Sequence, residues 1–284
     1  MNGMIGIGMP QENPHWEIKS VAKSLDIVDY IQEQDGATIN DLTSSINLSK
    51  STAYKHLKTL SERGYLTKEG DEYHIGVRFF HKGEYARTRK VGHRLAAQAV
   101  QDLAEKTDEE VDFLVGNNGK MIVIYESYHP DNPYGDDLTH PVEVREFAGA
   151  YYHMNTIAAG KATLASLSRD RVEEIIDQWG LPSLTEQTIT NRSELYEELE
   201  HIRDQGFACQ DEEYAKGLRS VAKVVHGADG NPLGAISVSG PIYRLQGEKF
   251  EEDLPNALIE TVDELEEMIE KRRKEEIGSE SLES

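Results

Sequence analysis

Three short helix patterns followed directly by a strand hairpin occupy residues 20 to 75, and this order constrains the fold more than any other feature of the chain. Apolar residues recur at three- and four-residue spacing from Ser20 until Gly36 ends the pattern, which predicts a first helix with one buried stripe. The stripe consists of Val21, Leu25, Val28 and Ile31.

The next two helices are indicated by their first residues. Thr38 is a favourable N-cap, and Asp41 stands three residues later, in the place of the Glu or Gln of a capping box. After a turn at residues 47 and 48, Ser49 caps a third helix. The expected inward side chains are Ile39, Leu42 and Ile46 on the second helix and Ala53, Leu57 and Leu60 on the third.

The third helix has a polar, basic outer face, and two strands follow it. Residues 65–68 and 71–75 flank Glu69-Gly70, which predicts a wing with Lys68 near its tip. In a helix-turn-helix, donors in the N-terminal half of the third helix reach base edges, while later lysines contact phosphates. The predicted DNA-contacting residues are Ser49, Lys50, Ser51, Thr52, Tyr54, Lys55, Lys58 and Lys68. A merely solvated basic face and a winged helix that binds only protein remain the alternatives.

The formal net charge of −22 is concentrated in the second part of the chain. Residues 16–90 hold 12 Lys/Arg and 11 Asp/Glu, whereas residues 91–284 hold 18 and 40. A polyanion can therefore approach the first part more easily. Such an acid excess is typical of proteins from salt-loving cells, and an ordinary acidic cytosolic protein is the alternative. A single cysteine, Cys209, and the lack of a bilayer-length apolar run predict a cytoplasmic protein without a membrane segment.

The length of 284 residues suits two domains. We expect a disordered tail at 1–18, a winged helix-turn-helix domain at 19–78, a linker helix at 79–94, a second domain at 95–274 and a loose acidic tail at 275–284. The linker carries a basic cluster, which either lies near the DNA backbone or neutralises acidic neighbours. This cluster is Lys82, Arg87, Arg89, Lys90 and Arg94.

The second domain alternates between strand and helix patterns. The expected strands are 111–116, 120–127, 142–147, 206–210, 220–225 and 233–238, with a loop at 129–137. The expected helices are 95–104, 156–167, 171–179, 193–205 and 251–274. An antiparallel sheet flanked by helices is an α+β architecture.

Two features of the second domain suit a polar pocket. Ala158, Ala159 and Gly160 at a helix start leave backbone N–H groups free for a carboxylate. Ser237 and Ser239 alternate along a strand, so both hydroxyls point to one face. Ordinary hydrogen bonding within the strand is the alternative role for these serines.

Both parts of the sequence resemble the IclR family of transcription regulators. In the first part, the resemblance is carried by residues 19–25, 48–60, 64–66 and 73–76. In the second part, it is carried by residues 159–162, 211–214, 217–222 and 235–241. The likeness covers about residues 19 to 272.

This resemblance implies a regulator of a catabolic operon, acting as a homodimer or a dimer of dimers on double-stranded operator DNA, without a cofactor. It implies a linker helix that relays ligand binding and a GAF-like effector domain. The implied effector contacts are Ala158, Ala159, Gln210, Ser220, Ser237 and Ser239. Gln210 and Ser220 stand where the family pattern has an acid and a cysteine, which favours an organic or sugar-derived acid over the smallest keto acids. Lys55 stands where many members have arginine, so the operator sequence stays open.

Other functions fit the sequence less well. A phosphate loop around Lys161 would need a glycine at Asn155 and Ser or Thr at Ala162. His129, His140, His153 and Cys209 match no zinc spacing, and no Ser/His/Asp set indicates catalysis. We therefore predict neither a metal site nor an enzyme. A C-terminal domain that only dimerises is the main alternative, and an enzyme of GAF-like fold is the weaker one.

Overall fold

The computed structural model describes residues 17–128 and 149–280, and side chains up to Glu276. The chain divides into two compact units between Arg89 and Lys90. Most of the expected N-terminal tail, the loop at 129–137 and the strand at 142–147 lie outside the described residues.

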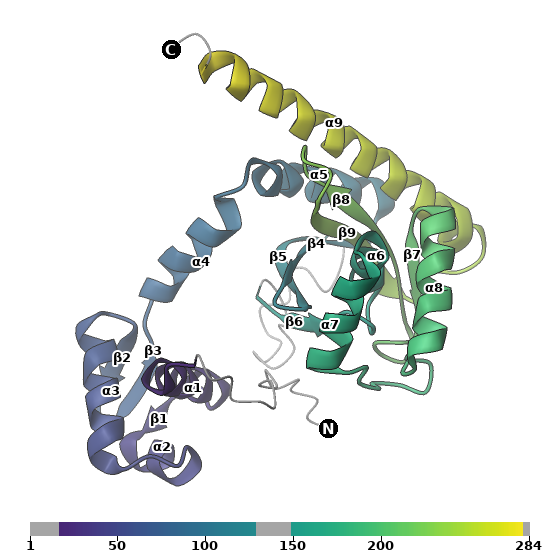
Figure 1. The fold of residues 1–284 in the computed structure, drawn as a ribbon. Helices are drawn as coiled ribbons and strands as arrows, with labels where there is room; N and C mark the ends of the chain where they lie inside the picture. Colours follow the sequence, from purple (N-terminus) through teal and green to yellow (C-terminus); the bar gives the residue numbers. More distant parts are fainter. Residues whose placement is uncertain (1–16, 129–148, 281–284) are drawn as a thin grey trace. The chain divides into compact units, whose positions relative to one another are not determined.

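The first unit is a winged helix-turn-helix followed by a further helix (Figure 1). Its elements are α1 (Lys19–Glu33), β1 (Ala37–Thr38), α2 (Ile39–Ser45), α3 (Lys50–Glu62), β2 (Leu66–Glu69), β3 (Glu72–Ile75) and α4 (Arg78–Thr88). The strands form an antiparallel sheet in the order β1-β3-β2. The β2–β3 hairpin is the predicted wing, and Lys68 lies opposite Tyr73 with its ammonium 5.6 Å from the ring centre. The short strand β1 was not expected.

The core of the first unit confirms most of the predicted inward faces. Leu42, Ala53 and Leu57 are fully buried. The stripe on α1 was only half right, because Val28 and Ile31 are buried whereas Val21 and Leu25 are each 53% exposed. The core packs against the second half of α1, where Ile27 is also buried, so the apolar residues of its first turns remain at the surface of this unit.

The predicted capping box at α2 is present. The Thr38 hydroxyl accepts a hydrogen bond from the Asp41 backbone N–H at 3.3 Å, and the Asp41 carboxylate accepts one from the Thr38 N–H at 2.9 Å. The Thr38 hydroxyl also donates to the Asp41 carboxylate at 2.6 Å, and this bond, followed by the one from the Thr38 backbone N–H, holds the pKa of Asp41 below its usual value.

Removing this cap is expected to destabilise the first unit. Thr38→Ala should lower the free energy of unfolding by about 1 kcal/mol, because the first turn of α2 loses an acceptor. Urea denaturation followed by circular dichroism measures this, with Thr59→Ala as the control, since Thr59 is exposed on α3 and its hydroxyl donates only to the Lys55 carbonyl. Equal stability of the two variants would contradict the assigned cap.

The second unit is an antiparallel sheet with helices on both faces (Figure 1). Its strands are β4 (Glu110–Asn117), β5 (Lys120–Ser127), β6 (Tyr151–His153), β7 (Ala208–Asp211), β8 (Leu218–His226) and β9 (Pro232–Pro241). Its helices are α5 (Val91–Thr107), α6 (Ala158–Ser166), α7 (Arg169–Trp179), α8 (Arg192–Gln205), the short π-helix η2 (Lys249–Asp253) and α9 (Leu254–Glu280). The strand order is β6-β5-β4-β9-β8-β7. The predicted β4–β5 hairpin is confirmed, and Asn118 and Gly119 at its turn both have positive φ, as a tight hairpin requires.

Each face of this sheet has its own core. Val111, Phe113 and Val238 pack with α5 and α9 on one face. Leu114, Ala222 and Ala235 pack with α6, α7 and α8 on the other. Leu195, Leu199 and Ile202 share the buried face of α8, as predicted. Because side chains alternate along a strand, residues between the α5-facing ones point toward α6.

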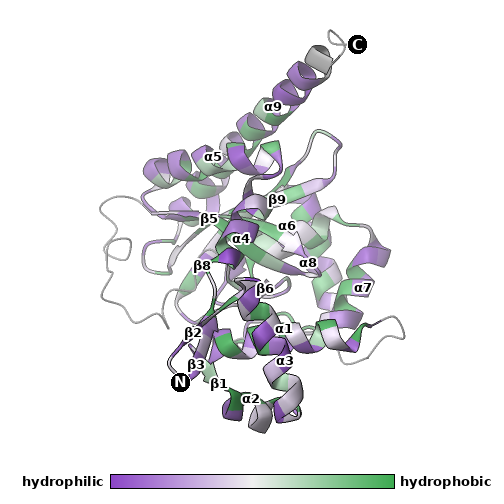
Figure 2. Cartoon of the chain, turned by 90° about the vertical axis from the view of Figure 1, so that its left-hand side faces the viewer, coloured by the Kyte–Doolittle hydropathy of each residue, from purple (hydrophilic) through white to green (hydrophobic). Residues whose placement is uncertain are grey.

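Two expectations about helices were wrong. The linker expected at 79–94 is not one helix, because Lys90 is extended (φ −93°, ψ 135°), which ends α4 before it and starts α5 after it. The tail expected from Glu275 is helical as far as Glu280. In Figure 2 the part of α9 before its grey end is coloured mostly as hydrophilic.

Candidate functional site

The outer face of α3 is exposed as the sequence predicted. Ser49, Lys50, Ser51, Tyr54, Lys55, Lys58 and Lys68 are exposed, and Thr52 is half-buried. The Ser49 hydroxyl caps α3 by accepting from the Thr52 backbone N–H at 3.2 Å, so Ser49 has a structural role within the protein. Lys58 lies 3.8 Å from Glu62 on the same helix. Within the described residues, Lys55 has no ion pair and its ammonium is available to a partner.

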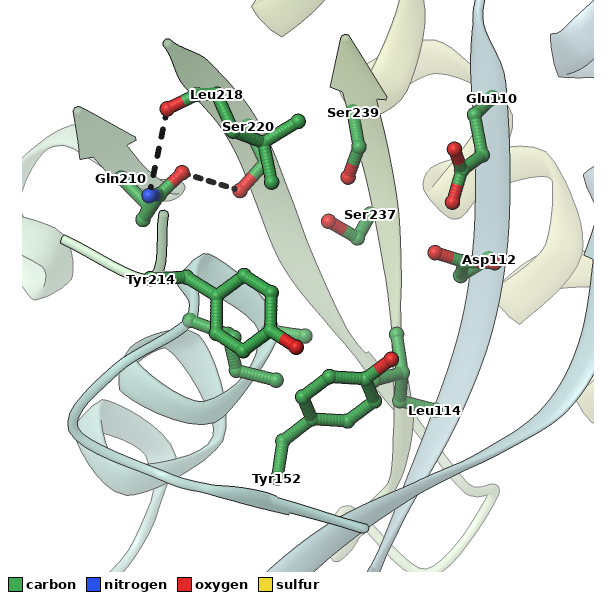
Figure 3. Close-up of a pocket in the computed structure, with 12 residues that line it drawn as sticks. Glu110, Asp112, Leu114, Tyr152, Gln210, Tyr214, Leu218, Ser220, Ser237 and Ser239 are labelled. Atoms are coloured by element: carbon green, nitrogen blue, oxygen red, sulfur yellow. Dashed lines mark hydrogen bonds between the residues drawn. The ribbon is translucent and has the colours of Figure 1, made fainter. Parts of the chain in front are cut away.

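A pocket of about 110 Å³ lies on the α6 side of the second unit's sheet (Figure 3). Strands β4, β7, β8 and β9 supply one wall, and residues from β6 and the start of α6 supply the other. The lining residues are Glu110, Asp112, Leu114, Tyr152, Ile157, Ala159, Gln210, Tyr214, Leu218, Ser220, Ser237 and Ser239.

The polar groups of the pocket come from neighbouring strands in register. Ser239 is paired with Glu110 and with Ser220, and Ser237 is paired with Asp112. Gln210 and Ser220 face each other across β7 and β8, and the Ser220 hydroxyl lies 3.3 Å from Oε1 of Gln210. Figure 3 shows these side chains along one surface, with the rings of Tyr152 and Tyr214 opposite them.

Carboxylates on β4 and β5 make this surface acidic. Burial, followed by the nearby Glu126 carboxylate, raises the pKa of Glu110 to about 7. Burial, followed by Glu110 and Glu126, raises the pKa of Asp112 well above its ordinary value. Asp112 is paired with Glu126 across β4 and β5, so three acids lie close together.

Helix α6 is held against the pocket by a close backbone approach and a buried ion pair. A Cβ at Gly160 would lie 2.3 Å from the Met154 carbonyl oxygen, so this position needs glycine. The Lys161 ammonium lies 2.8 Å from Glu198 and 2.6 Å from Glu213, and Lys161 is 1% exposed. Glu213 directly precedes Tyr214, so the ion pair connects α6 and α8 to the pocket wall.

The structure places most of the implied effector residues at this pocket. Ala159, Gln210, Ser220, Ser237 and Ser239 line it, whereas Ala158 is fully buried and is not among the lining residues. Glu110, Asp112, Tyr152 and Tyr214 also line the pocket and were not predicted from the sequence. The alternation of acids with Val111 and Phe113 was the available signal for the first two, because acids inside a strand that is apolar on its other face point to one common surface.

Nothing in the described residues indicates a metal centre. No group of three His, Cys, Asp or Glu side chains is arranged to hold a metal ion in residues 17–128 and 149–280. Burial raises the pKa of the Cys209 thiol to about 11, so this thiol is a poor ligand at neutral pH. His129 and His140 lie outside the described residues. No described helix has both the length and the apolar character needed to span a membrane.

Comparison with known proteins agrees with both units. Residues 20–70 match the model of the IclR helix-turn-helix domain, and residues 86–267 match that of the bacterial transcriptional regulator IclR C-terminal domain. The chain is 31% identical over 250 residues to the probable HTH-type transcriptional regulator ArcR of Halobacterium salinarum, covering 88% of this chain and 93% of that one. It is 27% identical to the transcriptional repressor IclR of Escherichia coli, covering 83% and 85%.

A solved structure agrees with the fold. The crystal structure of the Thermotoga maritima IclR superimposes with a TM-score of 0.67 at 23% identity, covering 89% of this chain and all of that one.

A winged helix-turn-helix followed by a domain with a pocket that several polar side chains line defines the class of DNA-binding regulators that respond to a small molecule. The chain belongs to the IclR family of transcriptional regulators, and its C-terminal domain is the effector-binding domain of that family. This is a family of transcriptional regulators, not of enzymes.

Proposed function

We propose that this regulator binds a roughly palindromic operator as a homodimer or a dimer of dimers, and that an effector in the described pocket changes its affinity for DNA. The observation that carries the proposal is the combination, in one chain, of an exposed basic α3 face and a pocket with convergent polar groups. A coupling between two such sites is typically worth about 1 to 3 kcal/mol. Control of a catabolic operon is part of this proposal.

Large apolar side chains on the surface of the first unit support the association of two copies. Six of them are between 53% and 89% exposed: Ile18, Val21, Leu25, Val77, Phe80 and Tyr85. Three of them lie on or beside α1 and three on or beside α4, and apolar side chains that join into a patch form an interaction surface. Pairing through this surface would present two α3 helices to successive major grooves, as palindromic recognition requires.

The cellular setting follows from the same proposal. A regulator of transcription acts where the DNA is, so we propose a cytoplasmic location. The acid excess of residues 91–284 and the similarity to a regulator from Halobacterium salinarum support an origin in a salt-loving cell. In such a cell, phosphate contacts contribute less affinity, because salt already screens the DNA.

The α3 assignment predicts a loss of operator affinity in Lys55→Ala. Removing this unpaired ammonium should weaken operator binding roughly tenfold, through the loss of about 1 to 2 kcal/mol of contacts to bases or phosphates. Fluorescence anisotropy with operator DNA at fixed salt measures the change, and Lys271→Ala is the control because Lys271 is exposed on α9. An unchanged affinity in Lys55→Ala would remove α3 from the DNA interface.

The sensing role is tested with the full chain bound to its operator. Small metabolites are added, and the fraction of bound DNA is followed by anisotropy. A compound that changes operator affinity in the wild type, but not in Ser237→Ala, supports sensing through the pocket. If no compound that binds the protein alters operator affinity, the C-terminal domain only dimerises, and the sensing proposal fails.

A further inference from the structure

The pocket contains negative charge that the described part of the protein does not balance. Glu110 and Asp112 alternate on β4 and both line the pocket. In residues 17–128 and 149–276, neither carboxylate has an ion pair or accepts a hydrogen bond. Ionised carboxylates removed from water are costly unless they are paired, so this arrangement is incomplete without a partner.

Several basic side chains of the second unit already contact other acids. Lys161 is bound to Glu198 and Glu213. Arg219 binds Asp211 with two hydrogen bonds of 2.7 and 2.8 Å. Lys249 and Arg244 both contact Glu109, the residue directly before β4. None of these cations pairs with Glu110 or Asp112.

Two more features of the pocket favour a positively charged group. Ser237 is 4% exposed, points into the pocket in Figure 3 and has no hydrogen-bond partner among the described residues, so an acceptor oxygen is available beside Asp112. Tyr152 and Tyr214 form an edge-to-face pair with ring centres 5.5 Å apart. Tyrosine rings attract cations through their electron-rich faces.

We infer that the effector carries a positively charged nitrogen, as an ammonium or guanidinium group, which binds between Glu110 and Asp112. This inference rests on the proposed sensing function and names its ligand class. A simple carboxylic acid would instead place its negative charge beside two acidic side chains, and each of these that is ionised repels it. A zwitterion satisfies both ends of the pocket, because its carboxylate can bind the free N–H groups at the start of α6. The organic or sugar-derived acid expected from the sequence would then be one that also carries a positively charged group.

The inference is tested by thermal shift of the full chain at pH 8 with a matched panel. The panel contains aliphatic amines, amino acids and guanidines, together with hydroxy acids and dicarboxylic acids of the same chain lengths. For example, 5-aminovalerate and 1,5-diaminopentane are compared with 5-hydroxyvalerate and glutarate. We expect the compounds that raise the melting temperature to be cationic.

Variants then locate the binding. Glu110→Gln/Asp112→Asn keeps the shape of both side chains and removes their charge, so it is expected to fold and to weaken binding of the active amine at least tenfold by calorimetry. Glu200→Gln removes one exposed acid on α8 and should bind the amine like the wild type.

The outcomes separate this inference from the proposed function. Acids that raise the melting temperature and alter operator binding, while amines do neither, overturn the inference and leave the sensing function intact; the carboxyl groups would then be protonated donors. A panel in which no cationic compound binds also overturns it. Cationic compounds that bind through Glu110 and Asp112 without altering operator affinity support the ligand class and contradict the sensing function.

Discussion

Replacing Lys161 by methionine is expected to lower the free energy of unfolding by about 3 to 5 kcal/mol. Lys161 is among the largest fully buried side chains of the protein, and its ammonium contacts Glu198 and Glu213. Methionine fills a similar volume but leaves Glu213, which is 8% exposed, without a cation. Oε2 of Glu213 already has no hydrogen-bond partner, so little else holds the ionised form. Burial already raises the pKa of Glu213, and the nearby Lys161 opposes this shift.

Urea denaturation at pH 7 measures the loss. Lys161→Met/Glu213→Gln should recover a substantial part of it, because the uncompensated charge is removed. Lys106→Met is the matched control, since Lys106 forms an exposed ion pair with Glu260 and should cost about 1 kcal/mol or less. A loss in Lys161→Met no larger than that of the control would show that the buried pair does not hold α6 in place.

Neutralising the pocket acids is expected to stabilise the protein at high pH. The pKa of Glu110 rises from its ordinary 4.5 to about 7 in the folded state, and that of Asp112 also rises. Between these pKa values the folded state binds more protons than the unfolded state. The free energy of unfolding therefore falls as pH rises from about 4.5 through about 7. Glu110→Gln/Asp112→Asn removes this dependence and should be more stable than the wild type at pH 8 by roughly 2 to 3 kcal/mol.

Two other titratable groups lie near the same acids, and they are identical in the wild type and the double variant. Glu126 lies opposite Asp112, and Tyr128 donates a hydrogen bond to Glu126. Melting temperatures of the wild type and the double variant, measured from pH 5 to pH 8, should diverge as pH increases. Glu200→Gln should follow the wild type across this range. Parallel curves for the wild type and the double variant would mean that water solvates the two carboxylates and that burial does not shift their pKa values.

The helix-turn-helix could be derived from local signals. Thr38 and Ser49 cap their helices because short hydroxyl side chains reach the free N–H groups of the first turn. Gly70 at positive φ turns the wing. These interactions join residues close in sequence, so their pattern is visible without a fold. The same periodicity overestimated the buried stripe of α1, since Val21 and Leu25 are apolar but nothing in the described first unit covers them.

The pocket could be derived only in part. The alternation of Ser237 and Ser239 correctly predicted that both face one side, and family resemblance supplied Gln210 and Ser220. Neither signal revealed that β4 lies beside β9, which places Glu110 and Asp112 next to Ser239 and Ser237. The strands are more than a hundred residues apart in the chain, and no local rule pairs them.

The sequence by itself determined the caps, turns and amphipathic faces of this regulator, and through its motifs the family, because each depends on neighbours within a few residues. Only the tertiary structure decided the acidic lining of the described pocket, the break between α4 and α5, and the burial of Lys161 between two acids. The physical reason is that burial and strand pairing set the electrostatic environment of a side chain, and both are properties of distant segments brought together.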